Sequence, residues 1–482
     1  MTAGIGSHAV RGTLWLGLVN LVSKGSQVVV TLVLAATLTE GGLGSVALAV
    51  AVVNIGQVIQ AMGVYDVIGR TERDPDRLAG TVLTLSVGTG LALAAVLVAA
   101  AAPVAALLGA PDAAPLVRLA AVSLPFTAAG GVQMAVMHRR LDFRRRLLPD
   151  AGSAVLGAAV TVVLAVTGAG PVALVAGLLC TAVAQPVLGA VVGVPPRPAW
   201  DAGAAREALG WIAVVGPAAL VAIVLVNVDY LAIGHVLGPA AVGVYSLAYR
   251  IAWVPYIMVA IVLAAVAFPV YTKLVRDGDR AALPAATARF TRATLVVTAG
   301  LYLVIALLAD RVVLLGDRWA PATPVLVLLC AYGLAISLLQ SWYQVIKAAG
   351  QARCYLLLEV THLVSLGAAL VLVTRHGMVA VAAAQVAAAW LLVVLTWCVL
   401  TRLALAFPTA ELAAMTAAVL GAAVPCVAVA VLADRLFGPP GTVAGVLAEA
   451  LALVVAYAGG SLLTQRAAVR ELRALTLAGG GR

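Results

Sequence analysis

The sequence predicts an all-α polytopic membrane protein with about 14 transmembrane helices. Of its 482 residues, 63% are hydrophobic and only 10% are charged, which is far outside the range of soluble domains. Apolar stretches of roughly 20 or more residues recur along the whole chain, and each can cross roughly 30 Å of hydrocarbon at about 1.5 Å per residue. A membrane β-barrel would instead show short segments of alternating polarity.

Loop charges, proline and glycine breaks and windows of about 20 residues divide the chain into individual spans. The predicted spans are residues 12–38, 42–64, 80–108, 114–137, 147–168, 170–192, 211–237, 240–268, 293–314, 323–347, 352–373, 376–400, 411–433 and 441–463.

The basic residues predict how the chain lies in the membrane. With a cytoplasmic N-terminus, 23 Lys and Arg residues fall in cytoplasmic segments and 4 in outside loops, and Lys24, Arg118 and Arg250 remain within spans. Cytoplasmic loops carry such an excess in membrane proteins. We therefore expect an inner (cytoplasmic) membrane protein with both termini in the cytoplasm. The net charge of +10 comes from separate loops rather than a continuous basic face, so no nucleic-acid partner is expected.

An internal repeat relates two glycine-bearing outside turns. Residues 38–44 read LTEGGLG and residues 237–243 read LGPAAVG, at an offset of 199, with six helices between corresponding positions. Copies of the same orientation indicate a parallel repeat. The predicted organisation is an N-terminal lobe at 1–195, a cytoplasmic linker at 196–210, a second six-helix lobe at 211–405, and two further helices with a cytoplasmic tail at 406–482. Chance similarity of Leu, Gly and Ala is the alternative.

Residues around the second copy resemble a known family. Residues 229–238 read DYLAIGHVLG and residues 243–250 read GVYSLAYR, which resembles the polysaccharide and oligosaccharide-lipid flippases of the multidrug/oligosaccharidyl-lipid/polysaccharide (MOP) exporter superfamily. The segment RRLDFRR at 139–145 is similar to the lipopolysaccharide and teichuronic acid exporter branch, and Phe268-Pro269, read as the end of the eighth helix, fits the same family. The resemblance covers roughly the first 400 residues.

This resemblance implies a fold and a function. It implies two lobes around a central cavity, alternating access, and transfer of an undecaprenyl-diphosphate-linked glycan from the cytoplasmic to the outer leaflet. The expected partners are the lipid-linked oligosaccharide and membrane lipids, with a polysaccharide polymerase and glycosyltransferases as further candidates.

The first two spans carry polar candidates for the cavity wall. Asn20, Lys24, Gln27 and Thr31 follow one another at spacings of 4, 3 and 4, which places them on one helical face. They line a hydrated cavity or make interhelical hydrogen bonds, as amides and hydroxyls often do. Lys24 requires water or an anion, because a cation inside a span is costly. The second span adds two amides to the predicted substrate cavity, Asn54 and Gln57.

The eighth span presents an aromatic stripe beside a cation. Tyr245, Tyr249, Trp253 and Tyr256 follow at spacings of 4, 4 and 3, with Arg250 about 15 Å from the outer end of the helix. Tyr249 and Trp253 are assigned to the substrate cavity, where they would stack on sugar rings; helix packing is the alternative. Arg250 is expected to bind diphosphate oxygens through paired hydrogen bonds, or to pair structurally with Asp229.

Three residues are candidates for ion coupling. Glu359 and His362 lie three residues apart on one face of the eleventh span, and Asp229 lies in the seventh. A buried acid and imidazole can relay protons or form a satisfied structural pair. No nucleotide-binding or zinc motif is present, so neither a cofactor nor ATP hydrolysis is expected. An ion gradient, the membrane potential or consumption of the product would drive transport.

The predicted function is therefore that of a transporter rather than an enzyme. The outside loops are short, the longest running from 310 to 322, and leave no room for an extracytoplasmic catalytic domain. Three rival functions stay open: a drug/cation antiporter of the same superfamily, a lipid II flippase, and a non-transporting scaffold of a glycan-assembly complex. The antiporter would need carboxylates deep in the first lobe, where Glu40 and Asp66 lie only at span ends.

Overall fold

The computed structural model describes residues 26–27, 29–61, 64, 67–68, 75–140, 142–193, 196–438 and 440–464. Within these ranges, 13 helices are long and apolar enough to cross a membrane. Each corresponds to one of the predicted spans from the second to the fourteenth. The first predicted span, 12–38, lies largely outside the described residues; its residues 29–37 are helical.

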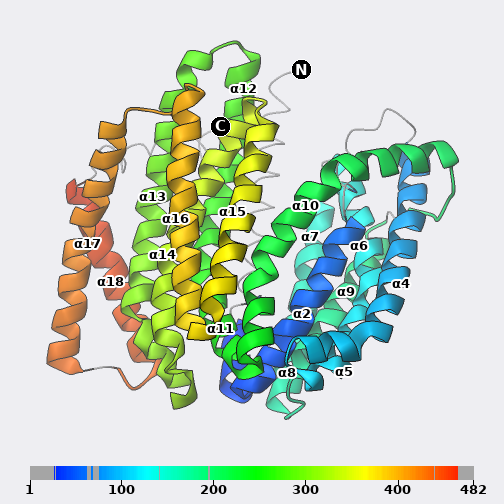
Figure 1. The fold of residues 1–482 in the computed structure, drawn as a ribbon, viewed down its shortest axis with the longest axis horizontal. Helices are drawn as coiled ribbons and strands as arrows, with labels where there is room; N and C mark the ends of the chain where they lie inside the picture. Colours follow the sequence, from blue (N-terminus) through cyan, green and yellow to red (C-terminus); the bar gives the residue numbers. More distant parts are fainter. Residues whose placement is uncertain are drawn as a thin grey trace. The chain divides into compact units, whose positions relative to one another are not determined.

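The chain divides into two compact units, residues 1–246 and 247–482. Figure 1 shows each as a bundle of long helices. The helices of the first unit are α2 (Glu40–Ala61), α4 (Pro75–Leu107), α5 (Ala114–Ala121), α6 (Ser123–Arg139), α7 (Phe143–Leu147), α8 (Ser153–Val166), α9 (Val172–Val191) and α10 (Ala202–Leu237). Helix α11 (Pro239–Ala252) crosses the boundary.

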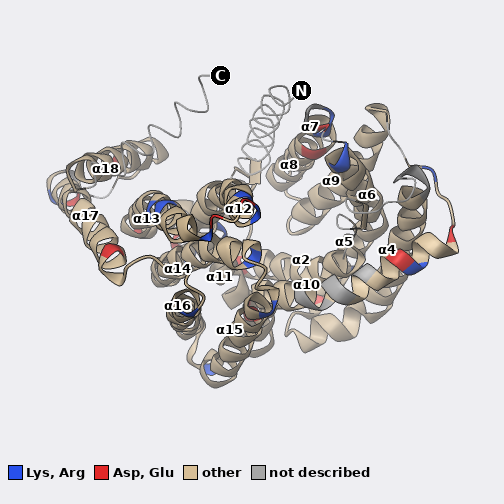
Figure 2. Cartoon of the chain, turned by 90° about the horizontal axis from the view of Figure 1, so that it is seen from above, with Lys and Arg blue, Asp and Glu red and all other residues tan. Residues whose placement is uncertain are grey.

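The second unit continues with seven helices and several short turns. They are α12 (Ile261–Arg276), α13 (Leu283–Leu307), α14 (Ala322–Ala348), α15 (Ala352–Val373), α16 (Met378–Arg402), α17 (Thr409–Phe437) and α18 (Val443–Thr464). Figure 2 shows charged residues on the short helix α7 and at the end of α12, while most of the helical ribbon is uncharged.

The predicted linker and the predicted end of the eighth span look different in the structure. Residues 202–210 are the first turns of α10, so little of the 196–210 segment is a loop. The predicted helix end at Phe268 is wrong, because α12 continues through Pro269 to Arg276. A proline inside a helix removes one hydrogen bond without necessarily ending it. Lys273 and Arg276 then occupy the last turn, where the helix dipole favours cations.

Glycines allow a close crossing of α8 and α9 in the first unit. A Cβ on Gly157 of α8 would overlap with the hydroxyl of Thr181 on α9, and a Cβ on Gly177 of α9 would overlap with the hydroxyl of Thr161 on α8. Each hydroxyl donates to a carbonyl of its own helix, Thr161 to Gly157 at 2.9 Å and Thr181 to Gly177 at 3.0 Å. Small residues four apart bring membrane helices together in this way.

The two copies of the sequence repeat contact each other reciprocally. The offset of 199 relates Gly44 to Gly243 and Glu40 to Pro239. A Cβ on Gly44 would overlap with the carbonyl oxygen of Pro239, and a Cβ on Gly243 would overlap with that of Glu40. Such exchange of equivalent contacts is the signature of a two-fold relation. This contact is consistent with the repeat, and the repeat and its six-helix lobes stay a prediction.

Two side chains of the last helix, α18, contact the rest of the second unit. The Tyr457 ring of α18 packs on Gly300 of α13, and its hydroxyl donates to the Val296 carbonyl at 2.9 Å. Arg311, just after α13, pairs with Glu449 of α18 at 3.1 Å, and both side chains are only 9% exposed. The Glu449 hydrogen bond is the main reason that the pKa of Arg311 is raised, so this arginine stays charged.

The reciprocal glycine contact predicts a selective loss of stability. Gly44→Ala forces a methyl group against the Pro239 carbonyl, and overpacking of this kind costs about 1–3 kcal/mol. Thermal unfolding in detergent, followed by size-exclusion chromatography, should give a lower Tm for Gly44→Ala. Gly41→Ala, three residues earlier on α2, is the matched control because nothing lies within 4 Å of its Cβ position. Equal melting of the two variants would contradict the contact.

Candidate functional site

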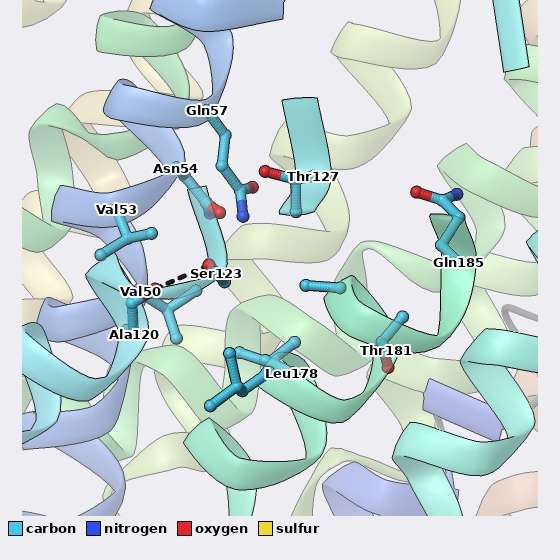
Figure 3. Close-up of a pocket in the computed structure, with 12 residues that line it drawn as sticks. Val50, Val53, Asn54, Gln57, Ala120, Ser123, Thr127, Leu178, Thr181 and Gln185 are labelled. Atoms are coloured by element: carbon cyan, nitrogen blue, oxygen red, sulfur yellow. Dashed lines mark hydrogen bonds between the residues drawn. The ribbon is translucent and has the colours of Figure 1, made fainter. Parts of the chain in front are cut away.

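A pocket with neutral polar walls lies inside the first unit. Its volume is about 230 Å³, and it is bounded by α2, α5, α6 and α9. Figure 3 shows Asn54 and Gln57 on one side of the pocket and Thr181 and Gln185 across from them. The lining residues are Val50, Val53, Asn54, Gln57, Ala120, Ser123, Thr127, Leu178, Leu179, Thr181, Ala182 and Gln185. None of these twelve described side chains is charged.

The hydroxyl groups of the pocket are bonded within the protein. Ser123 donates to the Ala120 carbonyl at 2.6 Å, and Thr127 donates to the Leu124 carbonyl at 2.9 Å. Thr127 also accepts a hydrogen bond of 2.6 Å from Gln60 of α2. These bonds fix the hydroxyls and leave acceptor lone pairs, because a hydroxyl oxygen has two.

The three amides of the pocket differ from the hydroxyls. Among the described residues, the side chains of Asn54, Gln57 and Gln185 have no hydrogen-bond partner. Each carboxamide has two donor hydrogens and an acceptor oxygen. In a membrane-spanning bundle such groups are costly unless water or a ligand meets them. Their convergence on one cavity therefore marks it as a candidate binding site.

Sequence reasoning named Asn54 and Gln57 but missed the facing wall of this pocket. Ser123, Thr127, Thr181 and Gln185 are polar residues inside apolar spans, and that was the available signal. Their helices are far apart in sequence, so no spacing rule connects them. Of the candidates on the first span, Gln27 is exposed and its carbonyl accepts from Thr31 at 2.8 Å. Asn20 and Lys24 lie outside the described residues.

The aromatic stripe, which begins on α11 and continues past its end, packs mainly on itself. The Trp253 ring stacks with Tyr249 at 5.0 Å between centroids and with Tyr332 of α14 at 6.4 Å, at interplanar angles of 23° and 19°. Tyr256 lies 4.5 Å from Trp253. Protein rings thus cover much of the indole surface that would stack on a sugar. Stacking of Tyr249 and Trp253 on substrate stays a prediction.

Asp229 is bonded by Tyr245, an aromatic residue that the sequence had assigned to the stripe. Its carboxylate is fully buried and accepts a hydrogen bond of 2.9 Å from the Tyr245 hydroxyl. The second carboxylate oxygen accepts from the Tyr230 backbone amide at 2.9 Å. The stripe spacing pointed to Tyr245 as a packing or stacking residue, whereas its hydroxyl satisfies a buried acid. Arg250 is half-buried on α11 and is not without an interaction partner.

The coupling candidates of α15 occupy a charged and aromatic cluster in the second unit. Glu359 interacts electrostatically with Lys347 of α14 and with Tyr256, and the Lys347 ammonium lies 5.2 Å from the centre of the Tyr355 ring. His362 is buried, and its Nε2 has no hydrogen-bond partner among the described residues. The sequence paired Glu359 with His362, and the structure adds Lys347 as a charge that interacts with the acid.

Comparison with known proteins identifies the family. A family described as polysaccharide biosynthesis proteins matches residues 33–324, more than half of the chain. The chain belongs to this polysaccharide biosynthesis protein family. It is 28% identical to the succinoglycan biosynthesis transport protein ExoT of Rhizobium meliloti (strain 1021), over 73% of this chain and 72% of that protein. It is 22% identical to the lipopolysaccharide biosynthesis protein WzxC of Escherichia coli (strain K12), over 67% of each.

Solved structures of a lipid flippase and of a multidrug transporter have a similar fold. This family member matches the lipid II flippase MurJ with a TM-score of 0.76 and 11% identity, over 95% of this chain and 99% of that chain. An inward-facing multidrug resistance transporter of the MATE family matches with a TM-score of 0.66 and 17% identity, over 80% and 98% of the two chains. The all-helical membrane fold predicted from the sequence is confirmed.

The bond between Tyr245 and Asp229 predicts a rescue. Tyr245→Phe removes the donor to a buried carboxylate, and hydrogen bonds to charged groups contribute about 1.5–3 kcal/mol. The Tm in detergent should fall by several degrees. Asp229→Asn in the Tyr245→Phe background should recover much of the loss, because a neutral amide is less costly to bury. A normal Tm for Tyr245→Phe would contradict the role.

Proposed function

We propose that this protein flips an anionic polyprenyl-diphosphate-linked oligosaccharide from the cytoplasmic to the outer leaflet of the inner membrane by alternating access, with both termini in the cytoplasm. The observation that carries the proposal is the likeness to ExoT, named as a succinoglycan biosynthesis transport protein, over nearly three quarters of the chain. The likeness to WzxC and the fold shared with a lipid flippase support the same class of cargo. A polysaccharide polymerase and glycosyltransferases are the proposed enzymatic partners.

The chemistry of the first unit argues against the drug/cation antiporter. A carrier of cationic drugs requires carboxylates where its cargo binds, and the pocket of the first unit has none among its described lining residues. The proposed cation site for the diphosphate consists of Arg250 and Lys24. A guanidinium binds diphosphate oxygens through paired, charge-assisted hydrogen bonds. The same cation site would also serve a lipid II flippase, whereas a non-transporting scaffold would have no use for it.

Deletion of the gene is expected to separate these functions. If the protein exports a glycan precursor, a surface polysaccharide should disappear and its lipid-linked precursor should accumulate on the cytoplasmic face. Both are measured by glycan analysis of cells and by extraction of lipid-linked sugars, with plasmid-borne wild-type protein as the control. Normal surface glycan together with raised sensitivity to cationic dyes would contradict the proposal and favour the antiporter.

Arg250 is expected to be essential for transport. Arg250→Ala should reduce export at least tenfold while the protein remains at normal abundance in the membrane, because the diphosphate loses its bidentate partner. Arg250→Lys should retain part of the activity, since the charge survives without the planar fork. Loss of the Arg250→Ala protein from the membrane, or normal export by it, would contradict the ligand role. Lys24→Ala should also impair export, and Lys24→Arg should impair it less.

A further inference from the structure

The pocket of the first unit offers hydrogen-bonding groups without any charge. Two amides of α2, Asn54 and Gln57, face Gln185 of α9 across the pocket, whose volume is about 230 Å³. None of the three side chains has a partner among the described residues. A ligand that meets them must supply several donors and acceptors at close spacing. A lone apolar tail supplies none, so an acyl or isoprenoid chain does not fit these walls.

The absence of charge in the described lining also excludes ionic ligands as the preferred occupants. A diphosphate or a carboxylate would lose its hydration without gaining a cation, and an organic cation would find no carboxylate. The amides are neutral and both donate and accept, as sugar hydroxyls do. The pocket therefore suits a polar but uncharged ligand.

The apolar side chains and the size of the pocket narrow the ligand further. Val53 of α2 and Leu178 of α9 supply aliphatic surface between the polar groups. A pyranose ring has the matching character, with C–H faces and hydroxyl edges. Sites for drug-sized molecules occupy roughly 300–1,000 Å³, so a pocket of about 230 Å³ accommodates one ring rather than an oligosaccharide.

The amides on the two walls of the pocket lie at similar distances along their helices. Gln57 lies 17 residues from the start of α2, and Gln185 lies 13 residues from the start of α9, which correspond to about 26 Å and 20 Å of helical rise. Both lie within membrane spans, four residues before the end of α2 and six residues before the end of α9. Gln185 is also seated against Gly130 of α6, where a Cβ would come within 2.5 Å of its amide oxygen. The glycine gives this side chain its place at the pocket wall.

We infer that this pocket binds one uncharged sugar ring of the transported glycan. The inference rests on the proposed function for the identity of the cargo, and it adds that sugar recognition resides within the first unit. The diphosphate and the sugar are then held by different chemistry, cationic for the first and neutral amide for the second. Glycan selectivity would follow from the amide positions.

Binding of neutral sugars to the purified full-length protein tests the inference directly. Methyl β-D-glucopyranoside and methyl β-D-galactopyranoside are titrated into the detergent-solubilised protein and followed by saturation-transfer difference NMR. At least one should bind saturably in the millimolar range, and glucuronate and ethidium should bind more weakly. Gln57→Leu and Gln185→Leu should each weaken that binding about tenfold, as expected for loss of one or two hydrogen bonds.

The controls separate loss of the site from loss of the fold. Gln344→Leu removes an amide of α14 that bonds only within its own helix, so sugar binding should not change. Gln57→Glu keeps the size of the side chain and introduces charge, and should turn the preference toward ethidium. Size-exclusion profiles confirm that each variant is folded. Wild-type protein that binds neither neutral sugar, or that binds glucuronate or ethidium better, overturns the inference.

Export measured on the same variants distinguishes this inference from the proposed function. If wild-type protein exports the glycan while Gln57→Leu and Gln185→Leu leave both sugar binding and export unchanged, the sugar site is wrong and the transporter stands. If neutral sugars bind as expected but deletion of the gene leaves surface glycan and precursor unaffected, the sugar site stands and the proposed function falls.

Discussion

Hydrocarbon offers no hydrogen-bond partners, and this constraint governs every polar contact inside the spans. Thr161 and Thr181 satisfy it locally, each donating to a carbonyl one turn back on its own helix. Asp229 of α10 satisfies it through the hydroxyl of Tyr245 on α11 and through the backbone amide of Tyr230 on its own helix. Glycine makes many of these solutions possible, because removal of a side chain lets a hydroxyl, an amide or a ring from the next helix approach the backbone.

Against this background the polar groups without partners carry the functional information. Asn54, Gln57 and Gln185 share one cavity, and no described residue meets them. Water or a ligand must do so. The second unit uses different chemistry: Glu359 interacts electrostatically with Lys347, whose ammonium lies 5.2 Å from the centre of the Tyr355 ring, and Arg250 lies on α11 beside Tyr249 of the aromatic stripe.

One helix irregularity lies next to the aromatic stripe. Pro255 follows the end of α11 and precedes a π-helical turn at Tyr256–Ala260, after which α12 continues with a second proline, Pro269. Proline has no backbone N–H to donate, so the regular pattern of helical hydrogen bonds has to change at these positions. The turn places Tyr256 against Trp253 and near Glu359. Through Tyr256, this π-helical turn is in contact with the aromatic stripe and interacts with Glu359 of the charged cluster.

The sequence by itself determined the membrane class, the position of 13 spans and the family. Hydrophobic length is a local property, and the loops that interrupt it are equally local, so these features need no knowledge of packing. The ends of the spans were predicted less accurately. Pro269 was predicted to follow a helix end, yet the helix continues, because one missing hydrogen bond costs less than ending the helix there. The 199-residue offset also came from sequence, although only the structure showed that Gly44 and Gly243 meet.

Only the tertiary structure decided which polar residues work together. Asn54 and Gln57 were candidates from sequence, whereas Gln185 and Thr127 joined them because α6 and α9 pack beside α2. Tyr245 was assigned to a stripe and proved to bond Asp229, and Glu359 proved to interact with Lys347. Helical spacing predicts which residues share a face of one helix. It carries no information on which helix that face meets, since this depends on the packing of small residues across the whole bundle.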